Sequence, residues 1–134
     1  MTEAGLVLAW VVVVGLSVGS FLNVVHHRWP LMRAQRRSEQ PGPVITLSTP
    51  ASRCPHCGHQ IRWFENIPVL SWLVLRGRCS SCKAPISWRY PALELAMGMA
   101  FGVIHLVGWP LAAQAAAAMG LSVLVAWVGS RRPA

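Results

Sequence analysis

Residues 5–25 read GLVLAWVVVVGLSVGSFLNVV, and this stretch decides the class of the protein. It contains no Lys, Arg, Asp, Glu or His, and a helix of this length would measure about 30 Å, the thickness of the hydrocarbon core of a bilayer. The alternative is a cleavable signal peptide, which begins with a positive residue and ends at a small-residue cleavage site. The chain instead starts Met-Thr-Glu, and His-His-Arg follows at 26–28, so we expect a retained transmembrane helix.

The composition agrees with a membrane protein. The chain has 134 residues, of which 54% are hydrophobic and 12% charged, whereas soluble domains carry about a quarter charged residues. Two further apolar segments, 91–107 and 111–128, flank a Gly-Trp-Pro turn at 108–110. We therefore predict a single all-α membrane domain, 1–134, with three transmembrane helices. For the short, Ala-rich third segment, an interfacial or packing helix remains the alternative.

The basic residues predict the orientation in the membrane. The 26–90 loop carries ten basic residues against Glu39 and Glu65, and Arg131 and Arg132 follow the third segment. Cytoplasmic loops are enriched in Lys and Arg, so we expect the N-terminus outside and both the loop and the C-terminus in the cytoplasm. The ten basic residues are Arg28, Arg33, Arg36, Arg37, Arg53, Arg62, Arg76, Arg78, Lys83 and Arg89.

Two Cys-x-x-Cys pairs in this loop predict a metal site. Cys54 pairs with Cys57, and Cys79 pairs with Cys82. Two such turns complete a tetrahedron of thiolates around zinc, and because four thiolates leave no open position, the site would be structural. Two disulfides are disfavoured in a reducing cytoplasm, and an iron–sulfur or redox site is the other alternative.

The rest of the loop is basic, aromatic and apolar. The segment 33–49 is polar and predicts irregular structure, whereas 61–64, 67–75 and 86–90 are rich in Trp and aliphatic residues. We expect these to dock on lipid headgroups, and we exclude nucleic acid as a partner because the basic residues are interleaved with apolar ones between two spans. His56 and His59 are interpreted as solvated loop residues rather than metal ligands.

Small and acidic residues within the apolar segments are further candidates. Gly15 and Gly19 form a G-x-x-x-G pair, as do Gly98 and Gly102. This spacing allows close approach of helices, and we expect packing between the first two spans rather than oligomerisation. Glu94 is expected in the first turn of the second span, where it complements the helix dipole and pairs with an Arg.

Five sequence blocks lie in a consistent order between about residues 15 and 100, and together they resemble one enzyme family. They are Gly19-Ser20-Phe21-Leu22-Asn23-Val24-Val25 with His27-Arg28-Trp29-Pro30; Ser52-Arg53-Cys54-Pro55-x-Cys57; Asn66-Ile67-Pro68-Val69-Leu70-Ser71-Trp72-Leu73; Arg76-Gly77-Arg78-Cys79-x-x-Cys82; and Ile86-Ser87-Trp88-Arg89-Tyr90-Pro91-x-Leu93-Glu94-Leu95. These blocks resemble the N-terminal part of the type IV prepilin peptidases, the bifunctional leader peptidase/N-methyltransferases.

The resemblance implies an enzyme of the bacterial inner membrane. It would remove the leader from prepilins or pseudopilins, in type IV pilus assembly or type II secretion, and methylate the new N-terminus with S-adenosylmethionine. Family cleavage uses two aspartates at the cytoplasmic ends of later helices, the first expected just after the third span. There this sequence reads WVGSRRPA at 127–134, and it contains no aspartate. No catalytic residue is therefore carried over, and we expect no protease activity of its own.

Three functional interpretations remain open. The chain is a stand-alone N-terminal domain that binds prepilin, a separate aspartyl-protease subunit or a second copy of itself; a methyltransferase-only enzyme; or a non-catalytic remnant or assembly factor. No Gly-rich cofactor loop follows a strand, so S-adenosylmethionine rests on the resemblance alone, with no binding residues identified. Whether the chain is an enzyme is not decided by the sequence.

Overall fold

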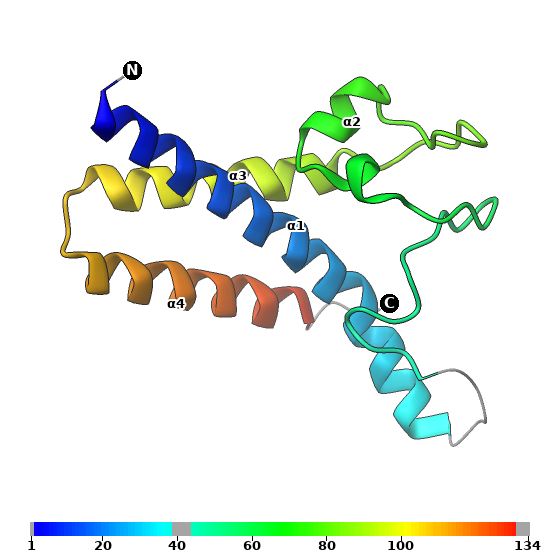
Figure 1. The fold of residues 1–134 in the computed structure, drawn as a ribbon. Helices are drawn as coiled ribbons and strands as arrows, with labels where there is room; N and C mark the ends of the chain where they lie inside the picture. Colours follow the sequence, from blue (N-terminus) through cyan, green and yellow to red (C-terminus); the bar gives the residue numbers. More distant parts are fainter. Residues whose placement is uncertain (1, 39–43, 131–134) are drawn as a thin grey trace.

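The computed structural model describes residues 2–38 and 44–130, and these residues form helices joined by one long loop (Figure 1). No strand occurs among them, apart from two isolated β-bridges in the loop. Glu39, Arg131 and Arg132 lie outside the described residues. The helices are α1 (Glu3–Ser38), the 3-10 helix η1 (Trp63–Asn66), α2 (Leu70–Val74), α3 (Arg89–Leu106) and α4 (Leu111–Ser130).

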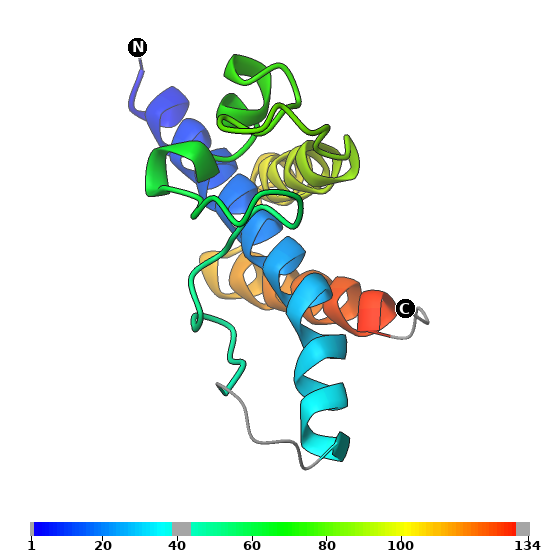
Figure 2. The ribbon, with the colours of Figure 1, turned by 90° about the vertical axis from the view of Figure 1, so that its right-hand side faces the viewer.

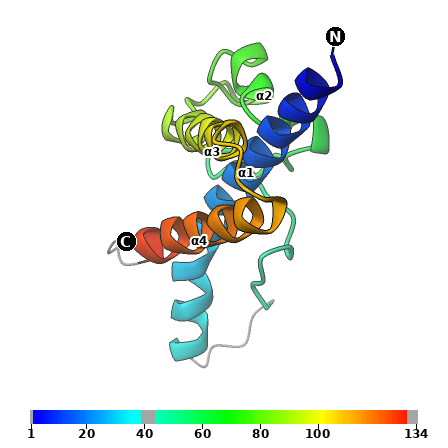
Figure 3. The same cartoon turned by 90° about the vertical axis from the view of Figure 1, so that its left-hand side faces the viewer.

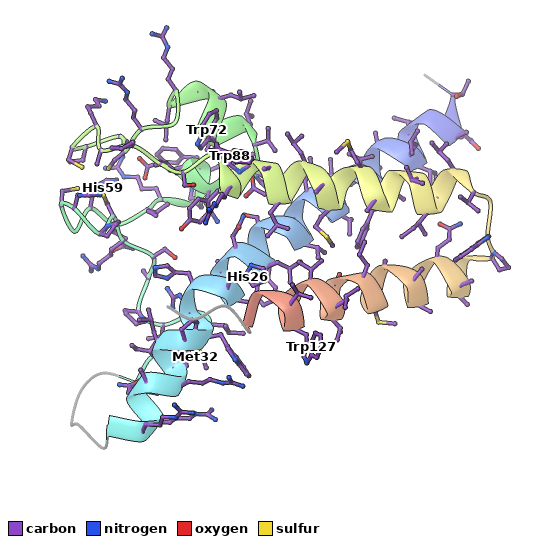
Figure 4. All side chains as sticks on the ribbon, turned by 180° about the vertical axis from the view of Figure 1, so that it is seen from behind. His26, Met32, His59, Trp72, Trp88 and Trp127 are labelled. Carbon is purple, nitrogen blue, oxygen red and sulfur yellow. The ribbon has the colours of Figure 1, made fainter. Side chains whose placement is uncertain are left out.

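The three long helices cross around α1. α3 and α4 form a hairpin closed by the predicted turn, in which Gly108 adopts a φ of +74° (Figure 1). α1 runs diagonally across this hairpin, with α2 on one side of it and α4 on the other (Figures 2 and 3). Its most extensive packing is against α3. The imidazole of His26 joins α1 to α4 through the carbonyl oxygen of Val125, at 3.0 Å (Figure 4).

Glycines bring α1 and α3 into backbone contact. A Cβ added to Gly15 would lie 2.9 Å from the Cα of Gly98, and one added to Gly19 would lie 2.6 Å from the Cα of Glu94. A Cβ on Gly98 would in turn meet the side chain of Leu16 at 2.8 Å. The prediction that the G-x-x-x-G pairs pack the first two long helices together is confirmed.

α1 is longer than the apolar stretch that predicted it. Its 36 residues correspond to about 54 Å, and the helix runs through Pro30 to Ser38. The expected irregular structure from residue 33 is therefore wrong for 33–38. A proline inside a helix costs about 3 kcal/mol, but the following Leu-Met-Arg-Ala-Gln-Arg-Arg segment consists of strong helix formers, which continue the helix.

One helix among the described residues, Glu3–Arg37, is long and apolar enough to cross a bilayer. Only 17% of its apolar window is buried in the molecule, unlike the core helix of a soluble protein. α4 contains a shorter apolar segment, Ala112–Val128, and α3 carries Arg89 and Glu94 within its 18 residues. Both predicted segments are helical, and that they span a membrane stays a prediction.

Candidate metal centre and the adjoining cavity

The four cysteines of the loop come together in one cluster. Their sulfur atoms all lie within 4.8 Å of one another, and none of the four forms a disulfide. The Sγ atoms of Cys54 and Cys82 are 3.8 Å apart. A zinc–sulfur bond of about 2.3 Å in a tetrahedron gives a sulfur–sulfur distance of about 3.8 Å, so this donor set fits zinc. Cys54 and Cys79 are buried, and Cys57 and Cys82 face solvent.

The cluster is built from two copies of one backbone turn. In the first, the N–H of Cys54 donates to the carbonyl of His59 at 2.9 Å, and the N–H of Gly58 donates to the carbonyl of Cys54 at 2.9 Å. The second copy repeats both bonds with Cys79 to Ala84 and Lys83 to Cys79. In each turn a backbone N–H bonds to the second cysteine, that of His59 to Cys57 and that of Ala84 to Cys82, as in a Cys-x-x-Cys metal knuckle. The two cysteine pairs share their spacing because each is part of the same kind of turn.

The two turns differ at the position that requires a left-handed backbone. Gly58 has a φ of +71° and Lys83, its counterpart, a φ of +60°. A residue with a Cβ pays about 1–2 kcal/mol in this conformation. We expect Gly58→Ala to lower the stability of the loop by about 1 kcal/mol and Lys83→Gly to raise it by up to about 1 kcal/mol. Metal retention against a competing chelator measures both, and shifts in the same direction would contradict the expectation.

His59 links the two knuckles. Its Nε2 atom lies 3.1 Å from Oε2 of Glu65 and 3.2 Å from the hydroxyl of Ser80, next to the cysteine sulfur atoms (Figure 4). The interpretation of His59 as a solvated residue is therefore wrong, because the loop folds Glu65 back onto it, whereas His56 is exposed as expected. The backbone N–H of Arg62, 2.8 Å away, together with Ser80 and His59, lowers the pKa of Glu65 to about 2.

A cavity of about 580 Å³ lies beside the metal cluster, between the C-terminal half of α1, the loop and the start of α3. Its surface is mostly apolar, with polar and charged side chains distributed among the apolar ones, and mostly apolar surfaces with placed polar groups are typical of ligand sites. Among the apolar residues are Val24, Ile67, Leu75 and Ile86, and the aromatic ones are Trp72 and Tyr90. The polar residues discussed below are Arg28, Asn23 and Glu94.

Arg28 fastens the loop to α1. The residue is 8% exposed, and its guanidinium donates to the carbonyl oxygens of Thr46 at 2.8 Å and Pro50 at 2.5 Å, and to the hydroxyl of Ser52 at 3.4 Å. All three acceptors are neutral. A guanidinium forms several directed bonds from one side chain, so Arg28 organises the first part of the loop over the cavity.

Glu94 has a different position and partner from those expected. It lies in the second turn of α3, is 7% exposed, and accepts the backbone N–H of Val69 at 2.7 Å instead of pairing with an arginine. Val69 has a φ of +61° and ψ of −48°, and the N–H of Leu70 donates to the carbonyl of Pro68 at 2.6 Å, which together define a strained γ-turn. A buried carboxylate thus holds a strained backbone at the edge of the cavity.

Several aromatic side chains remain on the surface, as the lipid-docking prediction requires. Trp63 is 81% exposed and Trp88 68% exposed, whereas Trp72 packs on Gly77 and donates its indole N–H to the carbonyl of Ile86 at 3.1 Å. Figure 4 shows Trp88 at the start of α3, where the loop joins the long helices. Exposed rings of this kind are compatible with docking on lipid headgroups, which stays a prediction.

Comparisons with known proteins agree with the sequence resemblance. Residues 13–107 match the family model of the bacterial peptidase A24 N-terminal domain. The chain is 54% identical over 103 residues to a prepilin leader peptidase/N-methyltransferase of Stutzerimonas stutzeri, covering 69% of this chain and 36% of that protein. It is 48% identical over 120 residues to a type 4 prepilin-like proteins leader peptide-processing enzyme of Escherichia coli O78:H11, covering 85% of this chain and 43% of that protein.

A third relative has similar identity. A prepilin leader peptidase/N-methyltransferase of Myxococcus xanthus is 49% identical over 98 residues, covering 72% of this chain and 26% of that protein. This chain spans less than half the length of these curated relatives. No solved structure matches the chain.

Proposed function

Because this chain belongs to the family of the bacterial peptidase A24 N-terminal domain, we propose that it acts in prepilin or pseudopilin processing, in type IV pilus assembly or type II secretion. The observation that carries the proposal is the extent of the match. Residues 13–107 include most of α1, both knuckles and all of α3, which are the elements that enclose the cavity. The prepilin leader peptidase/N-methyltransferases named above carry two activities in their names. We assign a part of this prepilin processing to the cavity.

The proposal places the chain in the bacterial inner membrane as a single domain, 1–134, with spans at 5–25, 91–107 and 111–128. The outward exposure of α1 and the basic residues of the 26–90 loop support it. Zinc held by the four cysteines is structural in this proposal, because four thiolates leave no position for a reactant. Its role is to fix the loop that roofs the cavity.

The predicted topology has a direct test. A reporter fused after Ala134 is expected to read cytoplasmic, and one at the N-terminus external, because the basic loop stays inside. Native cysteines supply an independent check, since Cys57 and Cys82 are exposed in the loop. If a membrane-impermeant thiol reagent labels Cys57 and Cys82 from outside intact cells, the orientation is contradicted.

Methyl transfer is the activity that the cavity supports best. S-adenosylmethionine would supply an electrophilic methyl group on a sulfonium cation. The cavity has the volume for such a ligand, aromatic rings at Trp72 and Tyr90 suited to a cation, and polar groups of both charges at Arg28 and Glu94. A methyltransferase-only enzyme is thus favoured over a non-catalytic remnant or assembly factor. Both G-x-x-x-G pairs are used within the chain, which gives no support to a homo-oligomer through them.

This chain alone is expected not to cleave a prepilin leader. It contains no aspartate, and an aspartic protease needs two close carboxyl groups sharing a proton. Among the described residues, Glu65 is bonded to His59 and the Arg62 N–H, Glu94 is bonded to Val69, and Glu3 lies at the other end of α1. None of these carboxylates forms a pair with another.

The same experiment tests cleavage and methylation. Purified protein is incubated with a full-length prepilin, or with the pre-cleaved pilin, and S-adenosylmethionine, and the products are analysed by mass spectrometry. We expect no loss of the leader and the addition of a methyl group to the pre-cleaved pilin. A shortened pilin that disappears with Glu65→Gln or Glu94→Gln would overturn the first expectation, and an unmethylated pilin would overturn the second.

A further inference from the structure

Glu94 is the buried carboxylate of the cavity that lacks a cationic partner. Its Oε2 atom accepts the N–H of Val69, and within 2–38 and 44–130 its Oε1 atom has no hydrogen-bond partner. In these residues every side-chain oxygen that is inaccessible to solvent has a hydrogen-bond partner. Because Oε1 has none, it is accessible, and Glu94 lines the cavity. The one ion pair in the described part of the chain joins His59 to Glu65. Buried charges in proteins are normally paired with an opposite charge, so a cation from outside the chain would complement Glu94.

The arginines near the cavity do not supply this cation. Arg28 is bonded to neutral oxygens of the loop, and Arg53 donates to the carbonyl of Gly58 at 3.2 Å. Trp72 and Tyr90 also line the cavity, and the π-faces of aromatic rings attract cations. The surroundings of Glu94 therefore suit a small cation that enters from outside the protein.

Asn23 provides a second acceptor close to Glu94. Its Nδ2 atom donates to the carbonyl of Tyr90 at 3.1 Å, and among the described residues its Oδ1 atom has no partner. Asn23 lies one helical turn beyond Gly19, which contacts Glu94, and Tyr90 lies one turn before Glu94 on α3. Asn23 and Glu94 thus lie about one turn apart on facing helices, and both line the cavity. An ammonium has three donors and no acceptor, which matches a site built from acceptors.

We propose that Glu94 and Asn23 form a binding site for a primary ammonium, and that its occupant is the N-terminal amine of a peptide substrate. This inference rests on the proposed function, because N-methylation acts on a nitrogen atom, and it adds the residues that hold that nitrogen. The apolar lining at Val24 and Ile67 suits the residues that follow the amine. The ammonium of a phosphatidylethanolamine headgroup has the same chemistry, and the experiment separates the two sources.

Binding of a short apolar peptide tests the site without depending on catalysis. A ten-residue peptide with a free N-terminus is compared with its N-acetylated form, using the full chain in uncharged maltoside micelles with its metal ion bound. The free amine is expected to bind about tenfold to a hundredfold more tightly, which is the usual effect of a hydrogen bond to a charged group. Equal dissociation constants for the two peptides would overturn the proposal.

Glu94→Gln is the informative variant, because the glutamine amide oxygen can still accept the Val69 N–H while the charge is lost. We expect this variant to keep its metal ion and to lose the preference for the free amine, and we expect the matched control Glu3→Gln, at the other end of α1, to retain it. A preference that persists in Glu94→Gln would rule out the site. If this variant does not fold, carbodiimide coupling decides on the unmodified chain: a peptide amine joined to Glu94 supports the site, and coupling only to other glutamates overturns it.

A separate experiment tests whether the ammonium comes from a lipid headgroup. Adding phosphatidylethanolamine, with phosphatidylglycerol as the control lipid, should leave the preference for the free amine intact. Abolition by phosphatidylethanolamine alone would assign the site to a lipid ammonium and overturn the peptide assignment. A pre-cleaved pilin that is methylated, while the peptides bind without any preference for the free amine, would refute this inference and leave the proposed function standing. Failure of every peptide and pilin to bind would refute both.

Discussion

Replacement of Cys79 by serine is expected to release the metal ion and to unfold the loop between α1 and α3. Cys79 is one of the two buried cysteines, and the sulfur cluster joins the two knuckles together with the contact of His59 with Ser80. Structural zinc contributes about 10–16 kcal/mol of binding free energy in small zinc-folded peptides, so loss of one thiolate removes more stability than such a loop has in reserve. The measurements are zinc content per chain and the rate of proteolysis within 44–88.

His56→Ala is the matched control for this experiment. His56 lies inside the first knuckle, but its side chain is exposed, so the variant should retain zinc and resist the protease as the unaltered chain does. A metal-free preparation whose four thiols are all alkylated in the native state would show that the cluster does not hold zinc. Loss of zinc in His56→Ala as well would show that the histidine participates in the site.

Gly19→Ala is the second substitution with a large expected effect, and it acts on the helix pair. The added Cβ would lie 2.6 Å from the Cα of Glu94 and 3.0 Å from the carbonyl oxygen of Leu93, both of which are backbone atoms. Backbone cannot move aside as the end of a flexible side chain can, so the helices must separate. We expect a loss of about 3 kcal/mol in the free energy of unfolding, at the upper end of the usual range for overpacking. Thermal unfolding in detergent followed by circular dichroism measures it.

Gly120→Ala is the control, because Gly120 is also a helical glycine but has nothing within 4 Å of an added Cβ. Alanine has the higher helix propensity, so this variant should be unchanged or more stable by up to about 1 kcal/mol. Equal stability of Gly19→Ala and Gly120→Ala would contradict the close contact of α1 with α3.

The sequence predicted the elements that follow from local rules. A charge-free run sets the position of α1, the Gly-Trp-Pro turn separates α3 from α4, and the G-x-x-x-G spacing identifies the contact of α1 with α3. The cysteine spacing alone was enough to predict that the four sulfur atoms form one cluster. Each of these signals is a short sequence pattern, although the helix pair and the metal cluster join parts that are far apart in the chain.

The parts that the sequence did not reveal depend on contacts between distant segments. Arg28 was counted only as a charge, yet its role is set by carbonyl groups about twenty residues away. Glu94 was expected to pair with an arginine, but the strained turn at Val69 presents a backbone N–H to it instead. His59 gave no sign of its contact with Glu65, since a lone histidine in a polar loop is usually solvated.

The separation in sequence between contacting residues also determines what the metal does for the helix pair. Gly19 and Glu94 are 75 positions apart, and the cross-link from Cys54 to Cys82 removes 28 positions from the chain that must be closed between them. Loop-closure entropy grows only with the logarithm of length, so this shortening favours pairing of α1 with α3 by only about 0.4 kcal/mol. The helices therefore associate through their own interface, and the metal-bound loop is a second cooperative unit that can open while α1 and α3 stay together.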